Sequence, residues 1–362
     1  MAFDLKKIFS SLQTAQSPQT TKVVGIDFGS SSIKVVELES KDDVIALSTY
    51  GELQLGPYGS SDMGTSVRLT TQKKVEALVD VMRESGVTAK SGVLALPLAD
   101  SFVTVISLAA KTDEDISSRI RVEARKYIPL PLTDVALEWT EIPQKDQKTA
   151  LTREIMLAAI QNTALSELTA ITDAIQMGAL PAEIELFSTA RATSKTTDVG
   201  SIAIIDIGAQ MTKVYITEGG YLRRLHRIQA GGSYITKVLA KELDLSFENA
   251  ENVKRNYQPA DARGVQIKQI VENVCQPAFS ECKRVINQHE LRTGTPIERI
   301  VLTGGCTLFP ELLSIARYAL DRDVVLSNPF NKVAYPAFLE DTLATIAPVF
   351  TVALGAALRQ FE

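Results

Sequence analysis

The sequence predicts a two-domain α/β fold made of two similar halves, with a small α+β block inserted into the first half. A strand–turn–strand pattern at 23–38 returns at 205–214, and in both copies Ile-Asp, an apolar residue and Gly precede Lys-Val. The Asp and the Lys are seven residues apart in each copy, which indicates a duplication. Residues 99–177, between the two copies, have strand and helix patterns of their own and form the predicted insertion.

The composition indicates a folded protein and argues against several function classes. The 362 residues correspond to roughly two to three domains, and 45 % of them are hydrophobic, which suits large buried cores. The net charge of −5 argues against a nucleic-acid partner. Three cysteines and two histidines make a disulfide framework, a histidine-rich metal site and a histidine triad improbable. We expect a cytoplasmic protein, because no secretory signal precedes the first domain.

The first 21 residues leave three interpretations open. Residues 1–12 carry an apolar stripe at helical spacing, and 13–21 are polar and linker-like. The stripe is typical of a frayed tail, of a weak membrane-surface helix or of a helix docked on a partner. Two lysines are few for a membrane anchor, so we favour the tail or the docked helix.

The remaining elements follow from periodicity, caps and turn residues. In the first half we expect strands at 44–53 and 93–96 around a helix at 72–85. In the insertion, Thr112 is expected to cap a helix over 112–127, and Gly178 to end a helix over 164–177. The predicted strands there are 102–108, 135–142 and 154–160. In the second half we expect helices at 233–243, 247–256, 262–291, 309–320 and 349–360, and strands from Ser201 and at 297–302 and 324–326.

The two turns together predict a clamp for the phosphates of a nucleotide. Either turn alone is also compatible with a plain hairpin. Glycine lets the backbone come close to a phosphate, while amides and hydroxyls donate to its oxygens. Mg²⁺ prefers oxygen ligands, and Asp27 and Asp206 at matching strand ends are placed to hold its waters. The predicted phosphate ligands are Gly29, Ser30, Ser31, Ser32 and Lys34 from the first turn, and Gly208, Ala209 and Thr212 from the second.

Other residues are candidates for the sugar and base. Gly304 and Gly305 follow a buried strand and could pass beneath them, and Glu251 and Lys254 could flank the base. Glu251 and Lys254 are also spaced as a helix-surface ion pair. We expect Lys213 to be a solvated strand residue. The chain has no P-loop pattern and no Gly-x-Gly-x-x-Gly after its first strand, which argues against P-loop enzymes and dinucleotide dehydrogenases.

The order of these motifs resembles that of the superfamily of actin, Hsp70 and sugar kinases. Asp-x-Gly-Ser-x-x-x-Lys, Asp-x-Gly-Ala-x-x-Thr, Gly231-Gly232 and Thr-Gly-Gly follow one another along the chain. The closer resemblance is to the PilM family of type IV pilus assembly proteins. It is carried by residues 24–38, by Glu-Ala-x-x-Tyr-Ile-Pro at 123–129, by Glu183-Ile184-Glu185 and by residues 355–359.

The resemblance implies an actin-like, ribonuclease H-like duplicated fold with ATP and Mg²⁺ between the halves. Gly231 and Gly232 join the expected cofactor ligands, and Glu185 and Asp206 are the candidate catalytic residues. Glu185 would orient water, or would have a structural role at a helix start. We expect binding and at most a slow Mg²⁺-dependent ATPase. The expected divisions are a tail at 1–21, subdomain 1A at 22–98, an SHS2-type subdomain 1C at 99–177, a connecting helix at 178–198, subdomain 2A at 199–232 and 292–340, subdomain 2B at 233–291, and a helix at 341–362 that returns to 1A.

The same resemblance implies the partner. PilM-like proteins bind the cytoplasmic N-terminal peptide of the bitopic membrane protein PilN in a groove near 1A and 1C. We therefore expect contact with a PilN-like protein and other pilus platform proteins, and peripheral membrane association through these partners at the inner membrane.

Two alternatives remain within the superfamily. An FtsA-like cell-division protein would end in an amphipathic membrane helix after a linker, whereas this sequence ends directly after the predicted helix at 349–360. A sugar kinase would need a catalytic acid and sugar-binding polar residues in the cleft, and we find no clear set of these.

Overall fold

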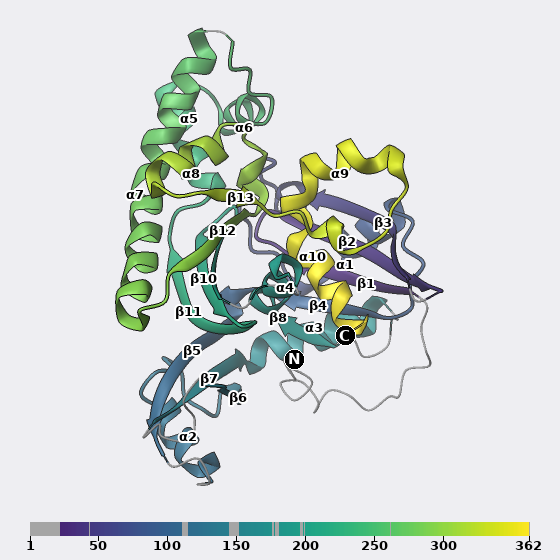
Figure 1. Cartoon of the computed structure of the whole chain (residues 1–362). Helices are drawn as coiled ribbons and strands as arrows, with labels where there is room; N and C mark the ends of the chain where they lie inside the picture. Colours follow the sequence, from purple (N-terminus) through teal and green to yellow (C-terminus); the bar gives the residue numbers. More distant parts are fainter. Residues whose placement is uncertain are drawn as a thin grey trace.

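The structure, a computed structural model, describes residues 22–42, 44–110, 115–144, 152–175, 177, 181–195, 198, 200–260 and 262–361. It has two halves side by side and a smaller lobe below them (Figure 1). The predicted stripe at 1–12, the linker at 13–21, the cap Thr112 and the helix stop Gly178 lie outside the described residues.

Each half is built on a five-stranded sheet, and the two sheets have the same strand order. In each, the first three strands are antiparallel neighbours and the last two join in parallel. The predicted duplication is therefore confirmed at the level of topology. The first sheet has the order β3 (Val44–Gln54), β2 (Ser32–Lys41), β1 (Lys22–Phe28), β4 (Gly92–Leu96), β8 (Ala182–Ile184). The second has the order β11 (Tyr221–Ile228), β10 (Thr212–Glu218), β9 (Ser201–Ile207), β12 (Ile297–Thr303), β13 (Val324–Leu326).

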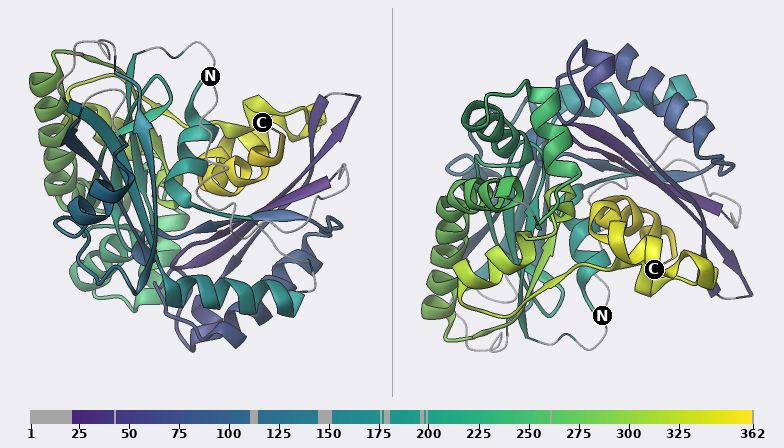
Figure 2. Two further views of the ribbon diagram at one scale, coloured as in Figure 1. Left: turned by 90° about the horizontal axis from the view of Figure 1, so that it is seen from below. Right: turned by 90° about the horizontal axis from the view of Figure 1, so that it is seen from above.

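Helices cover both faces of the first sheet (Figure 2). α1 (Thr71–Glu84) and α3 (Asn162–Ile175) lie on one face, and α4 (Glu185–Thr193) and α10 (Thr351–Leu358) on the other. The Thr70 hydroxyl caps α1 by accepting from the Lys73 amide, and the helix buries Ala77, Leu78 and Val81. A sheet covered on both faces explains why β1 and β4 are almost entirely apolar and buried.

α10 packs unusually closely, because glycines line both of its contacts. A Cβ at Gly25 of β1 would lie 1.9 Å from the Ala353 carbonyl oxygen, and one at Gly355 would lie 2.0 Å from the Ser188 carbonyl oxygen. The segment Ala337–Phe361 is apolar enough to cross a membrane by composition, with a mean hydropathy of 1.6. This hydropathy is the mean of an 18-residue window in the segment, and 72 % of that window is buried in the fold, as befits a core helix.

The second half carries α5 (Gly232–Glu242), α6 (Phe247–Arg255), α7 (Ala262–Thr293) and α8 (Leu312–Leu320). α7 is the long helix along the edge of the molecule in Figure 1. It buries Cys275 and Cys282, which pack in the apolar core of this half. α8 begins three residues later than predicted, because residues 309–311 still form a turn after the 3-10 turn at 305–308.

The lobe is a three-stranded antiparallel sheet with one short helix. Its order is β5 (Ser101–Ala109), β7 (Thr152–Gln161), β6 (Val135–Ile142), and α2 (Ser117–Ala124) packs on it. The helix ends three residues before the predicted Tyr127. Turns follow Ala124, since the residue before Pro129 is disfavoured in a helix. β8 and β11 were not predicted, and the helix expected at 341–362 is divided into α9 (Glu340–Ile346), a 3-10 turn at 347–350 and α10.

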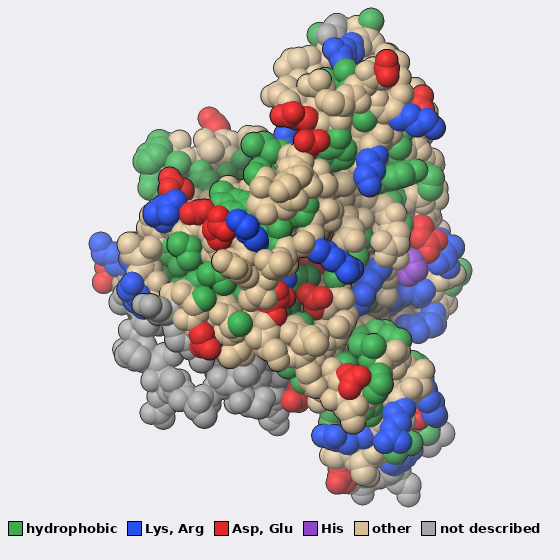
Figure 3. Space-filling view, turned by 180° about the vertical axis from the view of Figure 1, so that it is seen from behind, with side chains coloured by type: hydrophobic (Ala, Val, Ile, Leu, Met, Phe, Trp, Pro, Cys, Tyr) green, Lys and Arg blue, Asp and Glu red, His purple; other side chains and the backbone are tan. Residues whose placement is uncertain are grey.

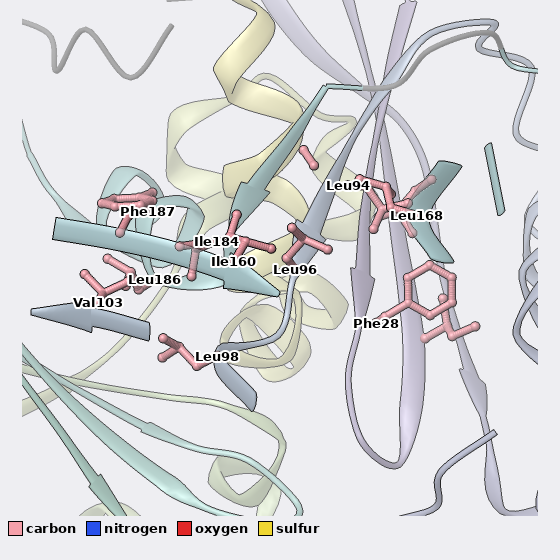
Figure 4. Close-up of a cluster of buried hydrophobic side chains, with 14 of the residues drawn as sticks. Phe28, Leu94, Leu96, Leu98, Val103, Ile160, Leu168, Ile184, Leu186 and Phe187 are labelled. Carbon is pink, nitrogen blue, oxygen red and sulfur yellow. The ribbon is translucent and has the colours of Figure 1, made fainter. Parts of the chain in front are cut away.

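An apolar cluster joins the lobe to the first half (Figure 4). Leu96 and Ile184 come from the first sheet, Leu186 from α4, and Val103 and Ile160 from the lobe. All five side chains are buried. The lobe is therefore anchored by a shared core beside the cleft between the halves.

Candidate functional site

A large cavity of about 1040 Å³ lies between the two halves. Both hairpin turns, the start of α4, α5, α6 and the turn after β12 contribute to its lining. The cavity is therefore built from segments that are far apart in the sequence. Its size is at the upper end of that of small-molecule sites.

The first hairpin turn brings five of the predicted ligands to this cavity. The Gly29 amide donates to the Ser32 carbonyl oxygen at 3.0 Å, and a Cβ at Gly29 would lie 2.8 Å from that oxygen. Lys34 stands opposite Asp27 in the β1–β2 register. Its Nζ donates to Ser32 Oγ at 2.7 Å and lies 3.9 Å from Asp27 Oδ2. The lining residues of this turn are Gly29, Ser30, Ser31, Ser32 and Lys34.

The second turn repeats this arrangement but places its lysine differently from our prediction. Lys213 stands opposite Asp206 in the β9–β10 register. It is buried, with Nζ 3.0 Å from Asp206 Oδ2 and 2.6 Å from Glu185 Oε2. The prediction of a solvated Lys213 is wrong, because the alternation along β10 turns this side chain towards the cleft.

Glu185 and Asp206 therefore share a cation. Glu185 Oε1 also accepts from the Leu98 amide at 2.7 Å, so both of its oxygens have a partner. Burial by itself lowers the pKa of Lys213, but the charges of Asp206 and Glu185 outweigh it and hold that pKa well above its usual range. Lys213 is the residue that our sequence reasoning missed. The equal spacing from Asp27 to Lys34 and from Asp206 to Lys213 was the signal for it.

Asp27 is buried in the same group of charges. Desolvation raises the pKa of its carboxyl to about 6; Lys34 opposes this rise, and Glu185 adds to it. Asp27 and Asp206 both line the cavity at the matching strand ends that we predicted. Each aspartate lies within 4 Å of a lysine ammonium group, at 3.9 Å for Asp27 and 3.0 Å for Asp206, so a Mg²⁺ ion there would have a positive charge as a neighbour.

Two predicted ligands do not reach the cavity. Thr212 is buried behind the second turn and donates its hydroxyl to the Ala230 carbonyl oxygen at 2.6 Å. A Cβ at Gly231 would lie 2.6 Å from the carbonyl oxygens of Gly208 and Ala209. The two residues support the turn from behind, while Gly208, Ala209 and Gly232 line the cavity.

The far side of the cavity holds a second buried ion cluster. Glu251 accepts from Thr236 Oγ1 at 2.6 Å, Lys254 Nζ at 2.5 Å and Arg255 Nε at 2.8 Å. Burial alone would raise the pKa of Glu251, but Lys254 and the hydrogen bonds hold it below its usual range. Glu251 is thus no surface residue, and Glu251 and Lys254 both line the cavity.

The turn after β12 completes the wall. Gly304 has φ +95°, and a Cβ there would lie 2.5 Å from Asp206 Oδ1. A Cβ at Gly305 would meet nothing within 4 Å. Both glycines line the cavity; the backbone at Gly304 packs closely against Asp206, and the position of Gly305 is open.

A loop of the first half reaches across the cavity and was not anticipated. Ser233 Oγ of α5 donates to the Gly64 carbonyl oxygen at 2.7 Å, and Arg255 reaches Gln54 at 3.3 Å. Gly64 packs directly against the Glu251 side chain. The two halves therefore touch on the side of the cavity away from the lobe.

Comparisons with known proteins agree with this architecture. The fold is similar to a chain of the PilM–PilN type IV pilus biogenesis complex, with a TM-score of 0.77 and 22 % identity over 95 % of this chain and 100 % of that one. It is similar to MreB5 of Spiroplasma citri bound to AMPPNP, with a TM-score of 0.52 and 12 % identity over 95 % and 97 % of the two chains.

Two sequence relatives are cell division proteins. The cell division protein FtsA of Enterococcus faecalis is 23 % identical over 361 residues, which span 86 % of this chain and 79 % of that protein. FtsA of Bacillus subtilis is 28 % identical over 150 residues, only 35 % of this chain and 34 % of that protein.

The duplicated sheets and the cleft between their hairpin turns define an actin-like fold. The family model for type IV pilus assembly protein PilM matches residues 25–361, so the chain belongs to this family. The resemblance carried by the opening hairpin and the Glu-Ala-x-x-Tyr-Ile-Pro motif is confirmed.

Proposed function

We propose that this protein is an ATP-binding scaffold of a type IV pilus assembly platform, located at the cytoplasmic face of the inner membrane. The observation that carries the nucleotide part is the cavity of about 1040 Å³ with a glycine- and serine-rich turn on each side. Membership of the PilM family supports the pilus part. The similar fold of an AMPPNP-bound protein is consistent with a nucleotide in such a cleft.

The phosphates would lie between the two turns. Amides and hydroxyls of Ser30 and Ser31 would donate from one side, and the backbone of Gly208 and Ala209 from the other. Lys34 is held at the rim of this space by Ser32 and Asp27. The sugar and base would then lie towards Gly305 and the Glu251–Lys254 pair, where the cavity is lined by α6.

A binding experiment tests this arrangement. Isothermal titration should give a clearly tighter Kd for ATP than for adenosine, because the turns contact only the phosphates. We expect Lys34→Ala to weaken ATP binding by about tenfold and to leave adenosine binding unchanged. Lys237→Ala, on the exposed side of α5, is the matched control. Equal affinities for ATP and adenosine would rule out a phosphate clamp.

We further propose that the lobe binds the cytoplasmic N-terminal peptide of a PilN-like bitopic membrane protein. α2 and the turn after it expose Val122, Tyr127 and Leu130, with exposed fractions of 62 %, 42 % and 40 %. Arg125 and Lys126 lie between them on the surface. Figure 3 shows hydrophobic and basic side chains together on this lower lobe. Exposed apolar residues beside charged ones are typical of a peptide-binding surface.

A synthetic peptide with the N-terminal residues of the PilN-like protein from the same genome tests the partner. Fluorescence anisotropy should show saturable binding that Val122→Asp weakens by about tenfold or more, since it places a charge in an apolar contact. Val265→Asp, at an equally exposed valine of α7, is the control. Binding of the tubulin-like division protein in place of the peptide would favour the FtsA-like alternative.

A further inference from the structure

The two lysines of the hairpin turns hold the positions where positive charge would be needed beside a polyphosphate. Lys34 and Lys213 stand opposite Asp27 and Asp206 in equivalent registers. The exposed fractions of these two lysines are only 8 % and 9 %, and both line the cavity. The duplication has thus placed one buried ammonium group on each side of the cleft.

The residues present do not fit a hydrated Mg²⁺ at Asp206. Lys213 Nζ lies 3.0 Å from Asp206 and 2.6 Å from Glu185, so it occupies the space between these carboxylates. Mg²⁺ keeps several waters in a strict octahedron and needs open carboxylate oxygens. To reach Asp206, it would have to displace a buried ammonium from both of its partners or lie beside a like charge, and either is costly.

We propose that Lys213, together with Lys34, supplies the charge that a divalent cation would otherwise bring, so that the cleft binds a nucleoside di- or triphosphate without Mg²⁺. This inference rests on the proposed nucleotide function. A lysine ammonium is a compact point charge that serves phosphate oxygens well. One lysine from each turn would act on the phosphates from both sides.

Glu185 becomes a positioning residue in this arrangement. Its Oε1 accepts from the Leu98 amide and its Oε2 from Lys213, so each oxygen already has a hydrogen-bond donor within the protein. Leu98 precedes the lobe and Glu185 begins α4, so Lys213 is fixed from the first half although it belongs to the second. In the proposed arrangement Glu185 would orient the lysine, a structural role that the sequence had left open beside the orientation of water.

Titrations in excess MgCl₂ and in excess EDTA test the inference. For the unaltered protein the Kd for ATP should agree within about threefold between the two conditions. Lys213→Gln keeps hydrogen-bonding capacity and removes the charge; it should bind ATP at least about tenfold more tightly with MgCl₂ than with EDTA. Lys237→Gln, on the exposed face of α5, should behave as the unaltered protein.

The outcomes separate this inference from the proposed function. If the unaltered protein loses about tenfold or more in affinity in EDTA, the inference is wrong while the nucleotide function stands. If Lys213→Gln and the unaltered protein respond equally to Mg²⁺, Lys213 does not replace the cation. If ATP binds in neither condition, both claims fail. Should Lys213→Gln not fold, the ratio for the unaltered protein still decides.

Discussion

Gly64 is the residue at which the loop of the first half rests on the second. It has φ +79°, its carbonyl oxygen accepts from Ser233, and a Cβ there would lie 2.5 Å from Glu251 Cδ. We expect Gly64→Ala to lower the free energy of unfolding by about 2 to 3 kcal/mol through backbone strain and the clash with a buried carboxylate. Urea denaturation measures this loss.

Gly86 provides the matched control. It has φ +67°, but a Cβ there would meet nothing within 4 Å. Gly86→Ala should therefore cost only the backbone strain, about 1 kcal/mol. If the two variants lose the same stability, the contact between Gly64 and Glu251 contributes nothing.

Asp27 predicts a pH dependence. Burial raises the pKa of its carboxyl to about 6 from 3.8, so the folded state binds this proton more tightly than the unfolded state. The stability that this group contributes is present near pH 4 and is lost as the pH rises towards 6, by roughly 3 kcal/mol. Asp27→Asn should gain stability over the unaltered protein across this range. Urea denaturation at about pH 4 to about pH 7 measures the gain, and a difference that stays flat would contradict the raised pKa. Asp323→Asn, at an exposed aspartate, is the control.

Of the two Asp–Lys pairs at the cleft, the sequence predicted one correctly, Asp27 with Lys34. The spacing from Asp27 to Lys34 placed both at the cleft, and the same spacing from Asp206 to Lys213 should have done so for the second pair. Thr212 aligns with Ile33, whose side chain is wholly buried in the core. Because side chains alternate along a strand, Thr212 also had to point away from the cleft. The ion pair with Glu185 could not be predicted, since it joins two halves that only the fold brings together.

At the element scale, helix propensity and packing predict opposite effects on stability for an alanine at Gly355 of α10. Helix propensity alone would make Gly355→Ala stabilising by about 1 kcal/mol. The structure predicts the opposite, because the new Cβ would lie 2.0 Å from the Ser188 carbonyl oxygen of α4 and 3.1 Å from the Ala192 Cβ. We expect a loss of about 3 kcal/mol in thermal or urea unfolding. A stabilised variant would show that α4 and α10 can separate without cost.

Most elements could be predicted from periodicity, and the exceptions have physical reasons. β11 was missed because Arg223, Arg224, His226 and Arg227 interrupt its apolar pattern. It tolerates them as an edge strand that pairs only with β10. The helix expected at 341–362 is divided, because Ala347 and Pro348 begin a 3-10 turn that separates α9 from α10.

At the scale of the whole molecule, β11 links the second half to the lobe. Arg223 Nη1 lies 2.5 Å from Glu154 Oε2 of β7, and Arg227 donates to the Ser101 carbonyl oxygen at 3.0 Å. If nucleotide changes the angle between the halves and the lobe binds peptide better at one of these angles, the two ligands are coupled. The factor by which nucleotide changes the affinity for the peptide then equals the factor by which the peptide changes the affinity for nucleotide. We expect ATP to change the Kd for the PilN-like peptide by about fivefold or more.

Arg223→Gln should reduce this coupling, because it removes a charged contact between β11 and the lobe. The measurement is peptide anisotropy with and without ATP. Arg224→Gln is the control, since Arg224 contacts Gln288 of α7 and not the lobe. Coupling that is unchanged in Arg223→Gln would mean that the two sites communicate by another route.

The duplicated fold was visible in the sequence at this scale, but the closure of the cavity was not. The contact between Gly64 and Ser233 joins residues 169 positions apart, and no local sequence pattern around either residue indicates that the other is its partner. Repeated local motifs reveal equivalent halves. How the halves meet depends on packing over the whole chain.

The placement of α10 has a consequence for biosynthesis. The helix that covers β1 and β4 is encoded more than 250 residues after them, whereas the strands of the second sheet all lie within 201–326. The second half can therefore complete its core on the ribosome first. The first sheet has this face only partly covered, by α4, until residues 351–358 emerge, and a chaperone that shields nascent strands would act on the uncovered part during that interval.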